Sequence, residues 1–235
     1  MTLPSVSGSD APPDRTTDDT DIDHPWVATL YEALTPIEWL FRPHREYLAA
    51  DLSGRVLDLG AGTGRMFEPV LEATAAGDSA DDNSGPVEYH AIEPDPNMRR
   101  RATRCARDIG MAVDLRDARA EALPYPDDSF DVVLSSVVFC TIQDPDAALE
   151  EVARVLRPDG EFRFFEHVRA DGWRERGQNL CNPAWKRVAG GCNLNRATVE
   201  RFVGHDAFDV IEVERLSMGI FPATPFVRGL LRRRR

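Results

Sequence analysis

Residues 56–64 read VLDLGAGTG: an apolar run, one aspartate, and three glycines at alternate positions. An apolar segment that ends in a glycine-rich turn is typical of a buried strand leading into the ligand loop of an open α/β sheet. Glycine is needed where the chain turns tightly or lies directly against a ligand, because a Cβ there would collide. The stretch therefore predicts the first strand of such a sheet and a ligand held against bare backbone.

The glycine spacing fits neither of the two common phosphate loops. The dinucleotide pattern G-x-G-x-x-G would need glycine at Arg65 or Phe67, and no lysine follows as a Walker-type loop requires. Asp58 lies two residues before the first glycine, where its charge would repel a pyrophosphate and attract a cation. S-adenosylmethionine carries an ammonium and a sulfonium but no phosphate, so it fits this loop. A nicotinamide oxidoreductase is the weakest alternative.

Beyond the loop, strands and helices alternate in the rhythm of a doubly wound, mostly parallel sheet. The expected strands are residues 55–60, 87–93, 111–116, 130–136 and 161–168, and the expected helices are residues 66–74, 96–108, 145–156 and 173–188. Asn195 is expected to cap a further helix. Two late strands, residues 209–216 and an apolar piece near 219–224, would close the sheet as an antiparallel edge. We expect a Rossmann-like, seven-stranded sheet with helices on both faces.

Three segments follow from composition along the chain. Residues 1–23 are rich in Pro, Ser, Thr and Asp, so we expect a disordered acidic tail. Residues 24–53 carry apolar side chains at helical spacing and predict an N-terminal helical lid, divided into short helices by Pro36 and Pro43. Residues 54–235 form the main domain. Within it, the polar stretch AAGDSADDNSGP at 75–86 predicts a surface loop.

The charge balance and the cysteines restrict the setting in which the protein works. The net charge is −12, and Lys186 is the only lysine among 28 basic residues, a balance typical of proteins adapted to high salt. This acidity disfavours nucleic acid as a partner. Four cysteines without a CxxC pair predict free thiols and no metal site. There is no signal-peptide pattern and no apolar run of about 18 residues, so we expect a cytoplasmic protein, a monomer or a dimer.

Further polar residues follow the later strands, where open α/β sheets bind their ligands. Glu93 ends the second strand and can accept hydrogen bonds from both hydroxyls of a ribose. Asp117 follows the third strand and can bond an adenine amino group, with Ala118 offering a backbone contact. Ser135 and Ser136 end the fourth strand, facing the crevice.

Together, VLDLGAGTG, AIEPDP, RDARAEALPYPDDSFDVV and EEVARVLRPDG resemble the class I S-adenosylmethionine-dependent methyltransferases. The broad group includes the ubiquinone and menaquinone methyltransferases. The resemblance implies an enzyme that transfers a methyl group from S-adenosylmethionine to a small-molecule acceptor. It implies cofactor contacts at Asp58, Gly60, Ala61, Gly62, Gly64, Glu93, Pro94, Asp117, Ala118 and Ser135.

A narrower resemblance covers the later part of the chain. FFEHV, followed by NPAWKRVAGGCNLNR, is similar to the thiol S-methyltransferases of the methyltransferase-like family, which share an EHV…PAW…GCNL-x-R pattern. This likeness implies a thiol or another sulfur acceptor. A C- or O-methyltransferase acting on a quinone-like or lipid acceptor is the second hypothesis, and a non-catalytic S-adenosylmethionine-binding regulator is the third.

Four residues are candidates for contact with the acceptor. His167, at the end of the fifth strand, could serve as the base that deprotonates a thiol, although anchoring of the PAW segment is an equal alternative. Glu166 lies beside it and could bind substrate. Trp185 could shape the acceptor pocket. Cys192 could line that pocket or be a small buried hydrophobe.

The chain ends in FVRGLLRRRR, which mixes apolar residues with a basic cluster. A solvated tail is the simplest expectation for such an end. The sharper alternative is a weak peripheral contact with anionic membrane lipid.

Overall fold

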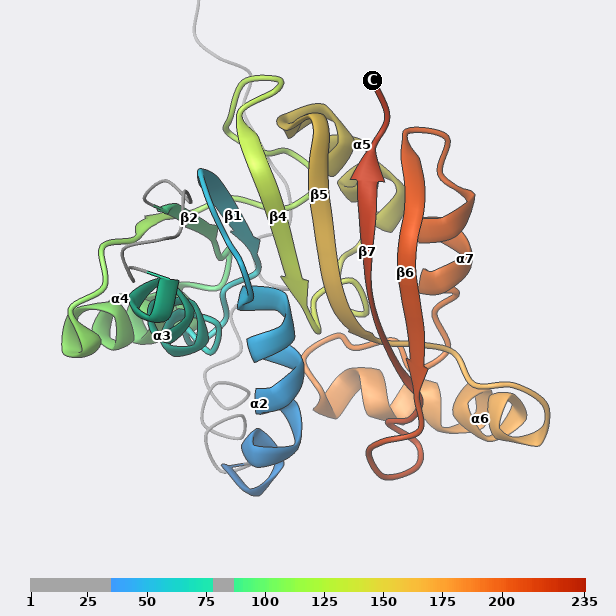
Figure 1. Ribbon diagram of the computed structural model, residues 1–235. Helices are drawn as coiled ribbons and strands as arrows, with labels where there is room; N and C mark the ends of the chain where they lie inside the picture. The colour runs from blue at the N-terminus through green and yellow to red at the C-terminus, as the bar shows by residue number, and fades with distance from the viewer. Residues whose placement is uncertain (1–34, 78–86) are drawn as a thin grey trace, which may run out of the picture.

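Seven strands form one sheet in the order β3-β2-β1-β4-β5-β7-β6 (Figure 1). The computed structural model describes residues 35–77 and 87–235. The strands are β1 (Arg55–Leu59), β2 (Glu88–Ile92), β3 (Asp114–Arg116), β4 (Phe130–Ser136), β5 (Leu156–His167), β6 (Phe208–Leu216) and β7 (Phe226–Arg233). Strands β1 to β5 pair in parallel, and β7 runs antiparallel to both β5 and β6. The predicted seven-stranded, mostly parallel sheet is confirmed.

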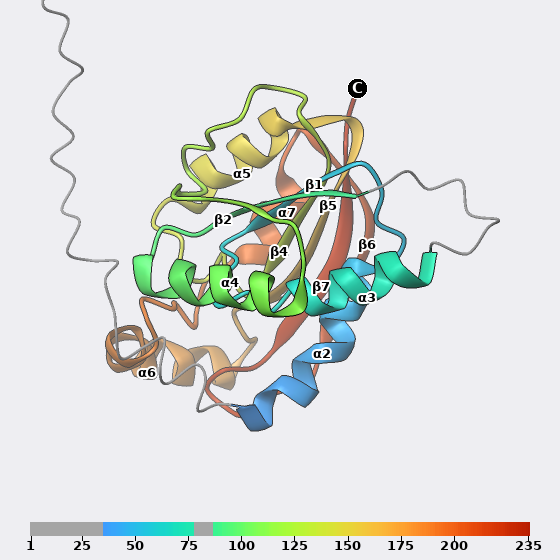
Figure 2. The same ribbon diagram turned by 90° about the vertical axis from the view of Figure 1, so that its left-hand side faces the viewer.

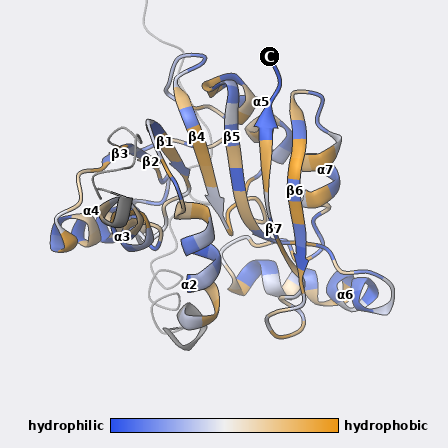
Figure 3. Cartoon of the chain, viewed as in Figure 1, coloured by the Kyte–Doolittle hydropathy of each residue, from blue (hydrophilic) through white to orange (hydrophobic). Residues whose placement is uncertain are grey.

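Helices cover both faces of the sheet (Figure 2). They are α2 (Thr35–Ala49), α3 (Phe67–Gly77), α4 (Pro96–Ile109), α5 (Pro145–Val155), α6 (Trp173–Val188) and α7 (Thr198–Gly204). Helices α2, α3 and α4 share one buried apolar cluster with the sheet, whereas α5 and α7 share a second one. Apolar residues therefore gather along the central strands, as Figure 3 shows, and burying them on both faces drives the assembly.

Helix α6 differs from the others because it lies beyond the carboxyl ends of β4 and β5 (Figure 1). Only Gln178 of this helix is buried. The Gln178 side chain accepts from the Ala170 N–H at 2.7 Å and donates to the carbonyls of Pro222 and Thr224. One buried amide thus fastens a largely polar helix over the end of the sheet.

Local sequence signals explain where α4 and α5 begin. Asp95 accepts from the backbone N–H groups of the first turn of α4, and Pro96 follows it. Asp144 and Pro145 repeat this arrangement at the start of α5. An N-cap carboxylate satisfies amides that have no partner within the helix, and proline tolerates the first helical position. Both starts agree with the expectation from sequence.

The N-terminal segment departs from the expectation of short helices. Helix α2 continues through Pro43 as one element of 15 residues. Phe41 packs against the rings of Phe165 and Phe226, with centroids 5.4 and 5.2 Å away. This packing against the sheet outweighs the helix-breaking tendency of proline. The predicted tail, residues 1–23, and the first part of the predicted lid lie outside the described residues.

Two further boundaries differ from the sequence prediction. Helix α3 runs to Gly77, so the first residues of the predicted loop at 75–86 are helical, and the rest of that loop lies outside the described residues. Asn195 does not cap α7. Its side-chain amide donates instead to Asn179 at 2.7 Å, while Ala197 stands at the N-cap without a side-chain hydrogen bond. A partner on α6 therefore outcompetes the local cap.

The C-terminal segment is the largest correction. Residues 226–233 form β7 in the interior of the sheet instead of a solvated tail, and the piece near 219–224 is a loop. Val227 and Leu231 are fully buried, whereas Arg232 and Arg234 pair with Glu161 and Asp209. From Val227 to Arg232, buried residues alternate with less buried ones, as a strand with one buried face requires. Contact of this basic end with a membrane stays a prediction, and no described helix is long and apolar enough to cross one.

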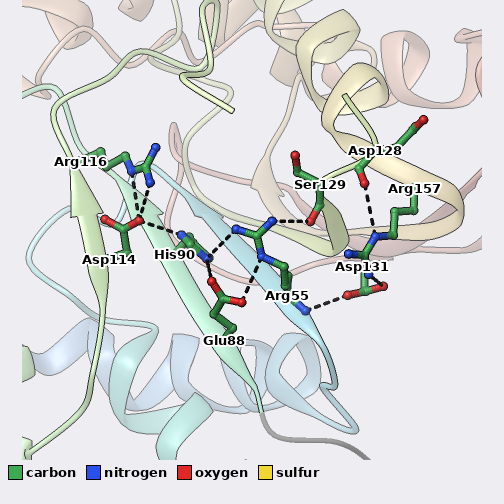
Figure 4. Close-up of polar contacts among 9 residues, drawn as sticks. All are labelled: Arg55, Glu88, His90, Asp114, Arg116, Asp128, Ser129, Asp131 and Arg157. Carbon is green, nitrogen blue, oxygen red and sulfur yellow. Dashed lines mark hydrogen bonds and ion pairs between the residues drawn. The ribbon is translucent and has the colours of Figure 1, made fainter. Parts of the chain in front are cut away.

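A polar network joins the amino-terminal ends of β1 to β4 (Figure 4). Arg55 pairs with Glu88, and its backbone N–H donates to Asp131 at 2.7 Å. The buried ring of His90 lies between the carboxylates of Glu88 and Asp114, at 2.7 and 3.0 Å. This network fastens the strands at the end of the sheet opposite their carboxyl ends, which are left to form the site.

Candidate functional site

A cavity of about 820 Å³ opens at the carboxyl ends of β1, β2 and β4. Strands β1 and β4 are neighbours, but the chain leaves them toward opposite edges of the sheet. Such a reversal leaves a crevice between the loops, where open α/β sheets bind ligands. The lining comes from the glycine loop, the loops after β2 to β4, and the residues at and after the end of α6.

The three glycines of the loop have positive φ angles but different neighbours. A Cβ on Gly60 would lie 2.8 Å from Val138, and a Cβ on Gly64 would lie 2.8 Å from the ring of Phe67. A Cβ on Gly62 would meet only the Gly60 carbonyl oxygen, at 3.9 Å, and would point into open space. Gly60 and Gly64 therefore serve packing inside the protein, whereas Gly62 keeps the cavity itself clear.

Glu93 and the residues beside it form one wall of the cavity. The Gly62 N–H donates to one carboxylate oxygen of Glu93, and the Asp95 N–H donates to the other, both at 2.8 Å. Burial raises the pKa of Glu93 to about 7, and these two N–H groups oppose the rise. A carboxylate has about four acceptor positions. Glu93 therefore retains acceptors for ligand hydroxyls, and Pro94 lines the same wall.

Asp58 lies at the floor of the cavity, at the end of β1. Its side chain is buried, and its Oδ2 has no hydrogen-bond partner among the described residues. Burial raises the pKa of Asp58 to about 7; the nearby Tyr89 and Arg45 oppose the rise, and Glu93 adds to it. A buried carboxylate oxygen without a partner is costly unless a ligand supplies one. The residue thus fits a ligand that brings a positively charged or N–H group.

Ala61 joins these two walls. It lines the cavity, and its N–H donates to the Ile92 carbonyl at 2.9 Å, tying the loop after β1 to the end of β2. Of the predicted cofactor residues, the structure therefore brings Asp58, Gly60, Ala61, Gly62, Glu93 and Pro94 together around one space.

The adenine contacts predicted from sequence are not brought to the lining. Asp117 is exposed and pairs with Arg99 at 2.7 Å, and Ala118 packs against the apolar core. Met98 and Ala120 border that part of the cavity instead. The loop after β3 borders the cavity, but the sequence could not tell which of its side chains turns inward.

Ser135 and Glu166 lie beneath the cavity and hold its rim. Ser135 is fully buried, and its hydroxyl donates to Glu166 at 2.6 Å; Ser136 lines the cavity in its place. Glu166 also accepts from the backbone N–H groups of Val138 and Phe139, at 3.0 and 3.1 Å. Neither Ser135 nor Glu166 borders the cavity itself. Both residues support the turn after β4.

His167 is not brought to the cavity. It is buried beside the ring of Phe226, at 5.5 Å between centroids, and neither ring nitrogen has a hydrogen-bond partner among the described residues. Burial lowers the pKa of His167 to about 4, although the backbone of Pro222 nearby opposes the fall. The ring is neutral at physiological pH and lies away from where an acceptor would bind, so the arrangement does not support a catalytic base.

The predicted acceptor residues Trp185 and Cys192 support the wall that their neighbours line. Lys186 follows Trp185 and lines the cavity, as do Gly191 and Asn193 on either side of Cys192. The neighbouring Cys140 side chain lowers the pKa of Cys192.

Sequence reasoning missed Arg45 of α2, Gln143 and Arg196, which also line the cavity. Arg196 donates to the carbonyls of Phe139 and Ile142, both at 2.5 Å, and so joins the α6–α7 connection to the turn after β4. The final arginine of the GCNL-x-R pattern was the available signal for Arg196. Nothing in the sequence marked Arg45, which reaches the cavity from a separate helix.

The comparisons with known proteins agree with this geometry. A methyltransferase-domain family model matches residues 57–164. Human thiol S-methyltransferase TMT1B is 29% identical over 196 residues, which cover 75% of this chain and 70% of that protein. The malonyl-[acyl-carrier protein] O-methyltransferase of Halorhodospira halophila is 38% identical over 114 residues, covering 47% of this chain and 34% of that protein.

Solved structures agree in fold. A SAM-dependent methyltransferase from Thermotoga maritima superposes with a TM-score of 0.62 at 19% identity, covering 90% of this chain and 98% of that one. The [4+2]-cyclase SpnF superposes with a TM-score of 0.61 at 21% identity, covering 82% and 80%. Identities this low speak for the fold alone. Motifs, fold and named relatives point the same way: the chain carries a methyltransferase domain, built on the class I fold and similar to the S-adenosylmethionine-dependent methyltransferases.

Proposed function

We propose that this methyltransferase transfers the methyl group of S-adenosylmethionine to a small thiol. The observation that carries the proposal is the position of residues 183–196, which resemble the PAW…GCNL-x-R pattern of thiol S-methyltransferases. This segment lines the cavity through Lys186, Arg187, Gly191 and Asn193. The likeness to a thiol S-methyltransferase thus extends to the wall that an acceptor would meet.

The opposite wall fits the cofactor. Asp58 and Arg45 would hold its charged amino-acid end, Glu93 would accept from the ribose hydroxyls, and Gly62 leaves the space that it needs. When bound, the cofactor supplies a methyl group activated on a positively charged sulfur. The protein's own residues have to orient the acceptor and exclude water.

Glu93→Gln should weaken the binding of S-adenosylhomocysteine, measured by titration calorimetry, by about 1.5–3 kcal/mol. The amide keeps the shape of the side chain, but its NH₂ group would face a backbone N–H of Gly62 or Asp95 and could no longer accept there. Asp117→Asn is the contrasting variant, because Asp117 pairs with Arg99 outside the lining. An equal loss of affinity in both variants would mean that Asp117 contacts the ligand, which would contradict the lining described above.

Deprotonation of the acceptor does not require a protein base in this proposal. The cavity lining includes no histidine among the described residues, and His167 lies outside it. A thiol ionises near pH 8.5 on its own, and the thiolate is the reactive form. The protein would then select and orient a thiolate formed in solution.

The methylation rate of a small alkyl thiol should rise with pH toward the pKa of the thiol. His167→Gln should change this rate by the same factor near pH 7 and near pH 9, because His167 does not face the cavity. The measurement is product formation with both proteins saturated with cofactor. A loss confined to neutral pH would make His167 the base after all. Methylation of a quinone-like or lipid acceptor without any thiol turnover would replace the proposal by the second hypothesis.

A further inference from the structure

Carboxylates gather on one side of the cavity, where Arg45 also acts on Asp58, and two adjacent cations border the other side. Asp58, Glu93 and Asp95 border the cavity where β1 and β2 end. Lys186 and Arg187 border it at the last turn of α6. A cofactor with a sulfonium and an ammonium suits the acidic side. The basic side is left for the second substrate.

Lys186 and Arg187 also differ from most cationic side chains of this acidic protein. Arg42 pairs with carboxylates of α2 and α3, Arg154 with Asp127 and Glu151, and Arg228 with Glu214. Lys186 and Arg187 form no ion pair with any described residue, although the chain holds 40 carboxylates and Lys186 is its only lysine. Two adjacent cations at a cavity are therefore left available for an anion from outside.

The position of these cations at a helix end has a simpler explanation, which accounts for only part of the observation. Cations near a helix C-terminus are favoured by about 0.3–1 kcal/mol through the helix dipole. That preference concerns the end of the helix and would be met by side chains pointing anywhere around it. It does not explain why both residues border the cavity, beside Gly190, Gly191 and Asn193, which offer no negative charge.

We propose that the acceptor is a small thiol that carries a carboxylate, with the carboxylate bound by Arg187 and Lys186. The inference rests on the proposed thiol S-methyltransferase activity and narrows its substrate class. A guanidinium binds a carboxylate through two parallel hydrogen bonds, and the ammonium adds a point charge. In the reaction, the acceptor sulfur forms its bond to the methyl carbon as the carbon–sulfonium bond breaks. The electron pair of that bond stays on the cofactor sulfur, and the thiol proton is released to solvent.

The test compares three thiols of similar size: 3-mercaptopropionate, its neutral amide 3-mercaptopropionamide, and cationic cysteamine. Arg187→Gln and Lys186→Gln should each lower kcat/KM for 3-mercaptopropionate by about tenfold, and by a much smaller factor for the amide. Each thiol is compared with itself between wild type and variant, so differences in intrinsic thiol pKa cancel. The wild-type preference for the anion should shrink as KCl rises from about 0.1 M to about 1 M, because screening shortens from about 10 Å to about 3 Å.

Arg176→Gln is the matched control. Arg176 lies on the same helix, is exposed and does not line the cavity, so the same charge is removed away from the site. An unchanged ratio of 3-mercaptopropionate to amide in the Arg176 variant, with a fall in the Arg187 and Lys186 variants, supports the inference. Equal losses for all three thiols in the cavity variants would overturn it and leave the thiol activity standing. If no thiol is turned over while S-adenosylhomocysteine still binds, the proposed function fails and this inference falls with it.

Discussion

Gly62→Val is expected to abolish S-adenosylmethionine binding while the protein remains folded. The added side chain would project into the cavity, where the nearest protein atom to a Cβ is 3.9 Å away, so the collision is with the ligand. A side chain in the path of a tightly packed ligand should raise the Kd by at least about 100-fold. Titration calorimetry measures the loss, and circular dichroism shows whether the fold persists.

The control has to isolate the backbone cost of leaving glycine. Gly62 has a φ of +56°, which a β-branched residue adopts only with strain. Gly110 has a φ of +72° and nothing within 4 Å of an added Cβ, and it lies at the end of α4, outside the cavity lining. Gly110→Val should therefore show a similar loss of stability with normal binding. Binding within tenfold of wild type in the Gly62 variant would mean that the cofactor does not occupy this cavity.

The bounds of the helices and strands show what local sequence can and cannot determine. The strand at 130–136 and the helix at 173–188 have the bounds expected from sequence. An apolar run between polar flanks marks the strand locally. The continuity of α2 through Pro43 and the insertion of β7 between β5 and β6 depend on partners far away in the chain. Such partners are invisible to a pattern read over a few residues.

Several residues predicted as ligand contacts lie one position away from a residue that borders the cavity. Ser135 bonds Glu166 beneath the turn after β4, whereas Ser136 lines the cavity. Likewise, Gly191 lines the cavity and Cys192 beside it does not. Neighbouring side chains of a strand point to opposite faces, and those of a turn diverge as strongly. A motif therefore identifies the segment that forms a site, whereas the orientation of each side chain depends on packing beneath it. His167 illustrates the limit, since covering by Phe226 removes a plausible base from the cavity.

Glu166 lies at the centre of that packing, and its loss should be the most destabilising single change near the site. The carboxylate accepts from the Ser135 hydroxyl and from the N–H groups of Val138 and Phe139. These bonds hold a turn in which Val137 has a φ of +62°, a strained conformation for a β-branched residue. Glu166→Ala leaves three buried donors without partners, so we expect unfolding free energy to fall by about 3–5 kcal/mol.

Chemical denaturation of Glu166→Ala and Ser135→Ala separates this role from a ligand contact. Ser135→Ala removes one of the three donors and leaves the carboxylate bound by two amides, so it should cost only about 1 kcal/mol. Loosening the turn in Glu166→Ala should also weaken cofactor binding, because Val138 packs against Gly60. Normal stability with lost binding in both variants would instead make them direct ligand contacts, as the sequence suggested.

The pH dependence of Glu166→Gln gives an independent check with a definite sign. Burial raises the pKa of Glu166 from 4.5 to about 7, against the opposing hydrogen bonds from Ser135, Val138 and Phe139. A carboxyl whose pKa is raised on folding stabilises the protein below its unfolded pKa, and this contribution is lost as the pH rises to the folded pKa. Wild type should therefore lose stability between pH 4.5 and about pH 7 relative to the variant, which has no such ionisation. The other buried carboxylates of the described residues, Asp58, Glu93 and Asp95, are present in both proteins and cancel in the difference. In denaturation experiments, the difference in unfolding free energy between wild type and Glu166→Gln should therefore narrow across this range. A constant difference would mean that Glu166 is already ionised in the folded protein near pH 5, because its three donors stabilise the carboxylate.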